Sequence, residues 1–76
     1  MENKSKPVIR AWIAKNYFNQ FEVGIERNNQ LFLLGVAETS EACKKHLDAY
    51  IAQKGYILGT LCEFSTMQEV NRMLEK

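Results

Sequence analysis

The first half of the chain carries apolar patterns that are typical of β-strands. Residues 8–15 (VIRAWIAK) are rich in β-branched and aromatic residues, and residues 20–27 alternate between polar and apolar positions with a period of two. Residues 30–37 (QLFLLGVA) are apolar at both alternating sets of positions, as in a central strand. Asn28-Asn29 tolerates the positive φ of a tight turn. We therefore predict three antiparallel strands over these ranges.

The middle of the chain predicts an amphipathic helix. Thr39-Ser40-Glu41 offers a hydroxyl to cap free backbone amides and an acid for the first turn. Gly55 is well placed to end the helix in a left-handed conformation. Apolar residues recur between these signals at helical spacing, at Cys43, Leu47, Tyr50 and Ile51.

The last third predicts a fourth strand over residues 56–64 (YILGTLCEF) and then a closing helix. Ser65 with Gln68, or Thr66 with Glu69, would form a capping box at its start. The apolar stripe of this helix consists of Met67, Val70 and Leu74. The predicted fold class is α+β, in the order βββαβα, with an antiparallel sheet of three to four strands packed against two helices.

Strand register predicts which side chains share a face of the sheet. We assume a two-residue turn at Asn28-Asn29 and a four-residue connection over 16–19. If that connection were one residue longer or shorter, every side chain of the first strand would lie on the opposite face. The first face then carries Trp12, Phe21, Val23, Ile25, Phe32, Leu34 and Val36. The second face carries Ile9, Ala11, Ile13, Glu22, Gly24, Glu26, Leu31, Leu33 and Gly35.

The second face is a candidate surface for a protein partner or for a homodimer. If both short helices cover the first face, the second exposes an apolar patch of the kind that marks partner surfaces. The alternative is that the helices divide between the two faces and leave no patch. The candidate partner-binding residues on this face are Ile9, Ile13, Leu31 and Leu33, flanked by Glu22 and Glu26. Tyr17 and Phe18, in the first connection, either pack over the edge of the core or form exposed aromatic anchors.

Length and charge narrow the class of protein. The 76 residues predict one domain over 8–76 after a flexible leader at 1–7, and the net charge of +1 argues against a strongly basic nucleic-acid binder. No apolar stretch is long enough to span a membrane, so we expect no membrane partner and a cytoplasmic location.

Cys43 and Cys62 form no metal or redox motif, and we expect free thiols. A disulfide between them would require the helix and the fourth strand to be neighbours.

The sequence predicts no enzyme, no cofactor and no metal site. His46 and Asp48 are two positions apart on one helix and point to different sides, so they cannot act as an orienting pair. Ser40, Ser65 and Thr66 are expected as helix caps rather than as nucleophiles. Nucleic acid is a less favoured partner, for which the candidate contacts are Arg10, Lys15, Lys44 and Lys45.

Two segments carry a family resemblance. Residues 35–50 (GVAETSEACKKHLDAY) and 64–74 (FSTMQEVNRML) resemble the hybrid-binding domain that precedes some ribonuclease H enzymes. The resemblance implies a sheet of three strands with two helices and the binding of RNA–DNA hybrids. The tryptophan with which that family starts its helix would fall at Ser40, and its basic residues before the final phenylalanine would fall at Cys62 and Glu63. The strand and helix order is also similar to the DNA-binding domain of phage-type integrases, whose free sheet face would here hold Glu22 and Glu26.

These observations predict a small non-enzymatic binding module that acts through protein–protein contact. Its size suits an accessory or inhibitor protein of the kind that phages and mobile elements encode. The alternative is a nucleic-acid-binding module of the hybrid-binding or integrase-arm type.

Overall fold

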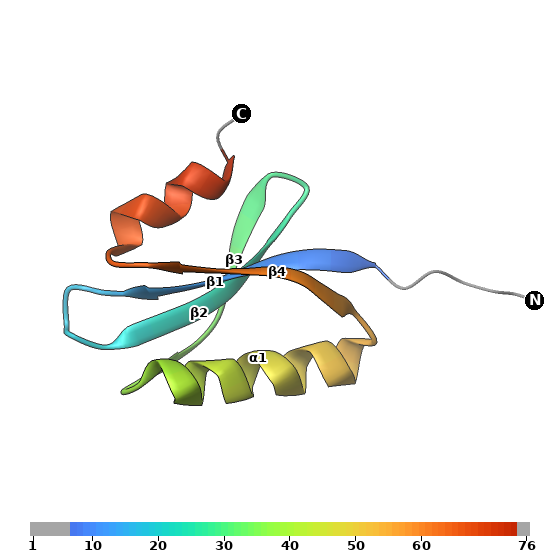
Figure 1. Ribbon diagram of the computed structural model, residues 1–76, viewed down its shortest axis with the longest axis horizontal. Coiled ribbons are helices and arrows are strands. Elements are labelled where there is room, and N and C mark those ends of the chain that lie inside the picture. Colours follow the sequence, from blue (N-terminus) through green and yellow to red (C-terminus); the bar gives the residue numbers. More distant parts are fainter. Residues whose placement is uncertain (1–6, 75–76) are drawn as a thin grey trace, which may run out of the picture.

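In the computed structural model, which describes residues 7–74, a sheet of four strands separates two helices. Figure 1 shows helix α1 on one side of the sheet and the 3₁₀ helix η1 on the other. The elements are β1 (Val8–Lys15), β2 (Phe21–Arg27), β3 (Gln30–Ala37), α1 (Ser40–Lys54), β4 (Ile57–Phe64) and η1 (Met67–Leu74). The predicted α+β class and element order are confirmed. The leader predicted over residues 1–7 lies, apart from Pro7, outside the described residues.

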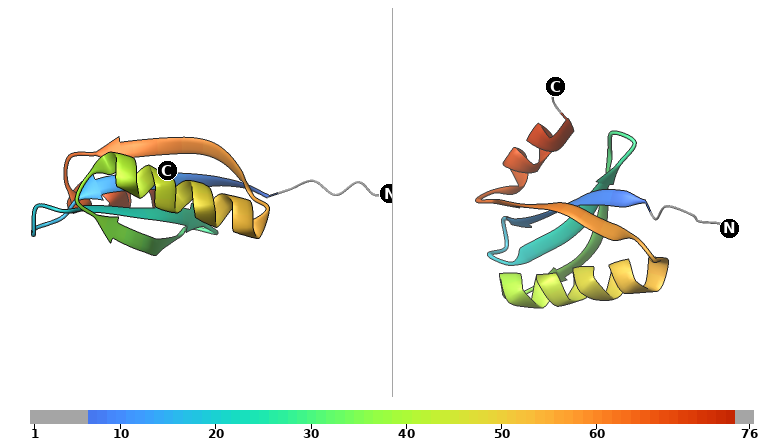
Figure 2. Two further views of the ribbon diagram at one scale, coloured as in Figure 1. Left: turned by 90° about the horizontal axis from the view of Figure 1, so that it is seen from below. Right: turned by 45° about the vertical axis from the view of Figure 1, so that its right-hand side comes forward.

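The strands lie in the order β3-β2-β1-β4. Both hairpins are antiparallel, but β4 pairs in parallel with β1, so the sheet is mixed and not wholly antiparallel as the sequence predicted. The reason is the helical connection. Because α1 carries the chain back along the sheet before β4 begins, β4 runs in the same direction as β3 and β1. In the left view of Figure 2, α1 lies across the sheet between the edge strands β3 and β4.

Local chemistry sets the ends of α1 and the second hairpin as predicted. The Thr39 hydroxyl accepts a hydrogen bond from the Ala42 amide at 3.1 Å. Gly55 adopts the left-handed conformation, with φ of 74°, and its amide donates to the Ile51 carbonyl. Asn28 and Asn29 both have positive φ in the turn between β2 and β3.

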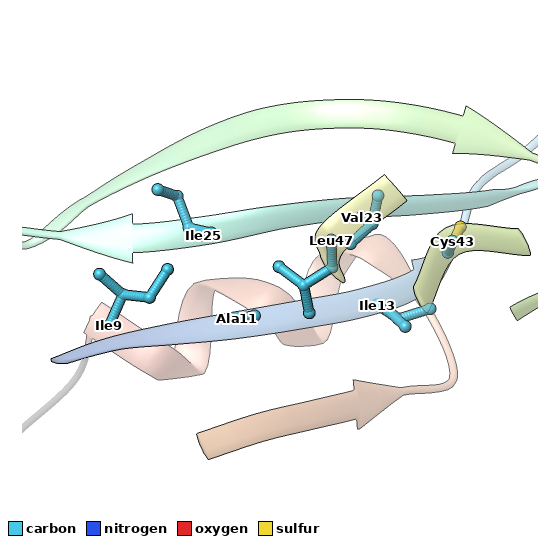
Figure 3. Close-up of a cluster of buried hydrophobic side chains, with 7 residues drawn as sticks. All are labelled: Ile9, Ala11, Ile13, Val23, Ile25, Cys43 and Leu47. Carbon is cyan, nitrogen blue, oxygen red and sulfur yellow. The ribbon is translucent and has the colours of Figure 1, made fainter. Parts of the chain in front are cut away.

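The main core lies between the sheet and α1 (Figure 3). Its buried residues are Ile9, Ala11, Ile13, Val23, Ile25, Cys43 and Leu47. Ile9 and Ile13 are each only 2% exposed, so their predicted place on an open partner surface is wrong. Lys15 pairs with Phe21, which makes the connection five residues long, over 16–20, instead of four. That one residue turns every side chain of β1 to the opposite face.

A smaller core lies between the other face of the sheet and η1. It is built from Trp12, Ala14, Val70 and Met73, with Leu31, Cys62, Phe64 and Met67 packed at its margin. Trp12 was predicted on the opposite face, and the same shift of register moves it here. At the start of η1 the Glu69 carboxylate accepts a hydrogen bond from the Ser65 amide at 2.9 Å. This cap pairs Ser65 with Glu69, whereas the predicted capping boxes paired Ser65 with Gln68 or Thr66 with Glu69.

The two helices therefore divide between the faces, but they cover them unequally. α1 packs across β1, β2 and β3, whereas η1 packs against β1 and β4. On the η1 side, the Trp12 ring covers β2 at Gly24, and the exposed apolar side chains lie on β3. Within residues 7–74, no helix is both long and apolar enough to cross a membrane.

Candidate interaction surface

The open apolar part of the η1 side lies on the edge strand β3. Leu33 is 57% exposed and Val36 is 41% exposed, while Leu31 packs at the margin of the Trp12 cluster. Leu31 and Leu33 thus lie on the face where the sequence placed them, and Leu33 is open to solvent as predicted.

Phe32 exposes a third apolar side chain from the other face of β3. It pairs with Ile25, whose side chain belongs to the core under α1, yet Phe32 itself is 45% exposed. Its predicted place in the core is wrong because β3 is an edge strand and has a neighbouring strand on one side only. We use the name β3 surface for the exposed side chains of Phe32, Leu33 and Val36.

A β-bulge explains why Val36 belongs to this surface. Val23 pairs with Gly35 and Gly24 pairs with Leu33, so Leu34 is an extra residue in β3. The inserted residue changes the alternation, which brings Val36 opposite Glu22 on the η1 side. The predicted place of Val36 on the core face is wrong because that prediction assumed a regular strand without a bulge. The signal was Gly35, since a glycine inside a strand often marks a bulge.

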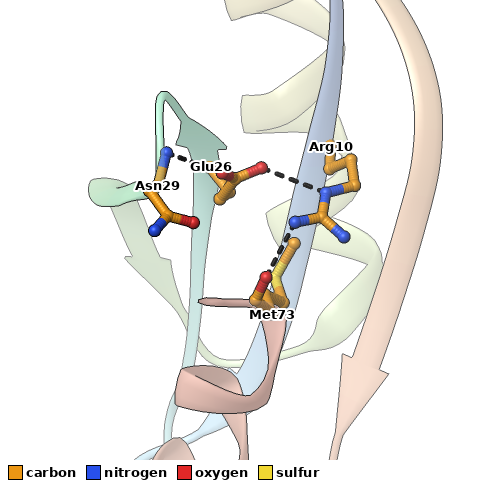
Figure 4. Close-up of polar contacts among 4 residues, drawn as sticks. All are labelled: Arg10, Glu26, Asn29 and Met73. Atoms are coloured by element: carbon orange, nitrogen blue, oxygen red, sulfur yellow. Dashed lines mark hydrogen bonds and ion pairs between the residues drawn. The ribbon is translucent and has the colours of Figure 1, made fainter. Parts of the chain in front are cut away.

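The predicted flanking acids, Glu22 and Glu26, lie on β2 beside the β3 surface, and both carboxylates are engaged. Glu26 pairs with Arg10 at 3.0 Å and accepts the Asn29 amide at 3.0 Å, while the Arg10 guanidinium also donates to the Met73 carbonyl at 2.8 Å (Figure 4). Glu22 accepts a hydrogen bond from the Asn16 side-chain amide at 2.9 Å. Glu22 therefore stabilises the first turn, and Glu26 stabilises the second turn and, through Arg10, η1.

The first hairpin presents two aromatic side chains to solvent. Tyr17 is 85% exposed and Phe18 is 82% exposed, so they follow the second of the two predicted alternatives, exposed aromatics, and do not pack over the core edge. The connection is ordered by Asn16, whose side-chain oxygen accepts the amides of Phe18 and Gln20 at 2.9 and 3.0 Å. Between this hairpin and the start of η1 lies a groove of about 220 Å³, lined by Lys15, Asn16, Tyr17, Ser65, Thr66 and Met67.

The four basic residues considered for nucleic-acid contact do not form one patch. Arg10 lies on the η1 side against Glu26 and Met73, whereas Lys44 lies on α1 and pairs with Glu63 at 3.5 Å. Lys15 lies over the Phe21 ring, and Lys45 is an exposed residue of α1. The charges are thus divided between opposite faces of the sheet.

The residues considered for catalysis or metal binding are also separated. His46 and Asp48 are exposed on α1, and within residues 7–74 no group of three or more His, Cys, Asp or Glu side chains is arranged to hold a metal ion. Cys43 and Cys62 are free thiols in the two different cores, on opposite sides of the sheet. Burial raises the pKa of the Cys43 thiol.

Comparisons of the chain with protein families, with curated proteins and with solved structures give no significant match.

Proposed function

We propose that this protein is a non-enzymatic binding module that acts through protein–protein contact, with the β3 surface as its principal contact and Tyr17 and Phe18 as a second one. The observation that carries the proposal is the exposure of three large apolar side chains at close positions on one edge strand. Edge strands of stable monomers are usually protected by charges, by proline, by bulges or by a covering segment. β3 has a bulge but neither a charge nor a proline.

The energetics of burial support a contact at this surface. Complete burial of a Val, Leu or Phe side chain is worth about 1.5–3 kcal/mol, and the residues of the β3 surface keep roughly half of that unrealised in the free protein. A partner that covers Phe32, Leu33 and Val36 recovers it. Leu31 and the engaged acids Glu22 and Glu26 form the margin of the contact.

The proposed role is that of an accessory or inhibitor protein in the cytoplasm, where two free cysteines remain reduced. Arg10 and Lys44 are already paired with acids and lie on opposite sides of the sheet, which argues against the hybrid-binding or integrase-arm alternative.

Affinity capture from an extract of the source cell tests this function. Wild-type protein, Leu33→Lys and Ile57→Lys serve as baits, with and without nuclease treatment, and mass spectrometry identifies the captured proteins. Ile57 is the matched control because it is 46% exposed on the opposite edge strand. We expect a protein that survives nuclease treatment, binds the wild type and Ile57→Lys, and is lost with Leu33→Lys. Equal capture by Leu33→Lys refutes the β3 surface, and loss on nuclease treatment favours the nucleic-acid alternative.

A further inference from the structure

We propose that the partner of the β3 surface is a second copy of this chain, and that two copies pair β3 with β3 in antiparallel orientation to form one continuous sheet. This inference rests on the proposed function and names the partner and the geometry of contact.

The position of the exposed side chains indicates that the occupant lies in the plane of the sheet. Phe32 is exposed on the α1 side of β3, whereas Leu33 and Val36 are exposed on the η1 side. A helix or a flat surface packed against one face would leave the other face open. A strand added to the edge covers apolar groups on both faces, and its backbone pairs the open amides and carbonyls of β3.

Both edge strands contain one bulged residue, Leu34 in β3 and Gly59 in β4, so they differ mainly in their charges. β3 (QLFLLGVA) contains no charged residue and no proline. β4 contains Glu63, which is exposed and pairs with Lys44 of α1, and it has the exposed polar residue Thr60 near its centre. Charges on an edge strand oppose the addition of another strand. The strand-adding edge is therefore β3.

The composition of β3 favours its own copy as the added strand. Two uncharged apolar strands place apolar side chains opposite one another on both faces, with no like charges in contact. Orientation follows from the flanking residues. In an antiparallel pair, Glu38 at one end of β3 lies near the Asn28-Asn29 turn of the other copy, whereas a parallel pair would bring the two Glu38 carboxylates together. An antiparallel pair also has the closed two-fold symmetry that is most common among homodimers.

Sedimentation equilibrium over a wide concentration range tests the inference with wild-type protein and three lysine variants. We expect a reversible monomer–dimer equilibrium for the wild type. Leu33→Lys and Phe32→Lys should each weaken the dimer about 100-fold or more, because the substitution occurs twice in a two-fold contact and places two like charges in it. Ile57→Lys should leave the dissociation constant unchanged, and circular dichroism checks that each variant is folded.

Hydrogen exchange of the wild type gives an independent readout that needs no variant. Residues 30–37 should exchange more slowly at a concentration where the dimer dominates than at one where the monomer dominates, while residues 57–64 should exchange equally at both. A chain that remains monomeric at every concentration refutes the inference, as does a dimer without added protection of β3.

The variants also separate the competing geometries. A dimer that Leu33→Lys weakens and Phe32→Lys does not would be packed face to face on the η1 side. Assemblies larger than a dimer that Ile57→Lys abolishes would join β3 of one copy to β4 of the next. Either result overturns edge pairing between two β3 strands. A strictly monomeric protein that still captures a different protein through Leu33 would refute the second copy as partner and keep the proposed function.

Discussion

The indole ring of Trp12 occupies the space that a side chain at position 24 would need. A Cβ atom built on Gly24 would overlap the indole ring and also the backbone oxygen of Phe32. Trp12 is 3% exposed, and its indole N–H has no hydrogen-bond acceptor among residues 7–74. The ring is thus held by packing alone, and the absence of a side chain at Gly24 leaves the space that it occupies against β2.

Gly24→Ala should therefore destabilise the protein by about 1–3 kcal/mol, the usual cost of overpacking a closely packed site. Gly35→Ala is the matched control, because a Cβ there would make ordinary contacts, the nearest at 3.6 Å from the His46 ring. Urea unfolding of both variants measures the difference. Equal free energies of unfolding for the two variants would contradict the packing of Trp12 against Gly24.

Arg10→Met should loosen η1 while leaving the sheet intact. The substitution keeps most of the apolar stem but removes the bonds from the guanidinium to Glu26 and to the Met73 carbonyl. We expect faster hydrogen exchange in residues 67–74 and a loss of about 1 kcal/mol in stability, because the pair is partly exposed. Lys44→Met, which removes the exposed pair with Glu63 on the other side of the sheet, should leave exchange in η1 unchanged. Similar exchange of η1 in the two variants would show that Arg10 does not hold it.

Asn16→Ala should destabilise the first hairpin, whereas replacement of the exposed aromatics should not. The Asn16 side chain makes three hydrogen bonds, to the amides of Phe18 and Gln20 and to Glu22. Their loss should lower the free energy of unfolding by about 1–2 kcal/mol. The double variant Tyr17→Ser, Phe18→Ser should change it by less than about 0.5 kcal/mol, because both rings are solvated. Thermal and urea unfolding compare Asn16→Ala with the double variant. A large loss of stability in the double variant would contradict the solvent exposure of Tyr17 and Phe18.

Stability should decline at alkaline pH. Burial is the main cause that raises the pKa of Cys43 above its ordinary value of 9.0 and that of Tyr50 above 10.0. The unfolded chain therefore releases these protons at lower pH than the folded protein does. The contribution of both groups is complete below pH 9.0 and is lost as the pH rises from these ordinary values toward the raised ones.

Urea unfolding between about pH 7.5 and pH 10.5 measures this decline. Cys43→Ala should lower stability at neutral pH, because it removes a buried group, but should make the alkaline decline shallower. A decline of the same slope in the wild type and in Cys43→Ala would show that the thiol does not contribute to it.

Features that depend on a few neighbouring residues could be predicted from the sequence. The cap at Thr39, the left-handed end at Gly55 and the asparagine turn each require only a local match between residue type and backbone conformation. The faces of β1 depend on the number of residues in a connection, and the sequence between Asn16 and Gln20 does not define where pairing begins. The parallel pairing of β4 with β1 depends on the path of α1 across the sheet, which no local pattern specifies.

The same difference between local and tertiary features decides which residues of the candidate surface could be predicted. Leu33 could be assigned to the correct face because it lies only four residues after Asn29. The register that the asparagine turn sets still holds at that position. Ile9 and Ile13 were misplaced with the rest of β1. Phe32 was placed in the core because the edge position of β3 follows from tertiary structure. Val36 was placed there because the predicted register did not include the bulge at Leu34, for which Gly35 is the local signal.

The place of β1 in the sheet also has a consequence for synthesis on the ribosome. β1 pairs with β2 across a short hairpin, but its other edge pairs with β4, so that Val8 can meet Ile57 only after residues 57–64 have emerged. Until then the nascent chain presents an open, apolar inner strand in addition to β3. Long-range parallel pairing is a slow step in folding and leaves such strands open to aggregation. Chains that stall before β4 should therefore be recognised by chaperones, and the emergence and pairing of β4 should end that recognition.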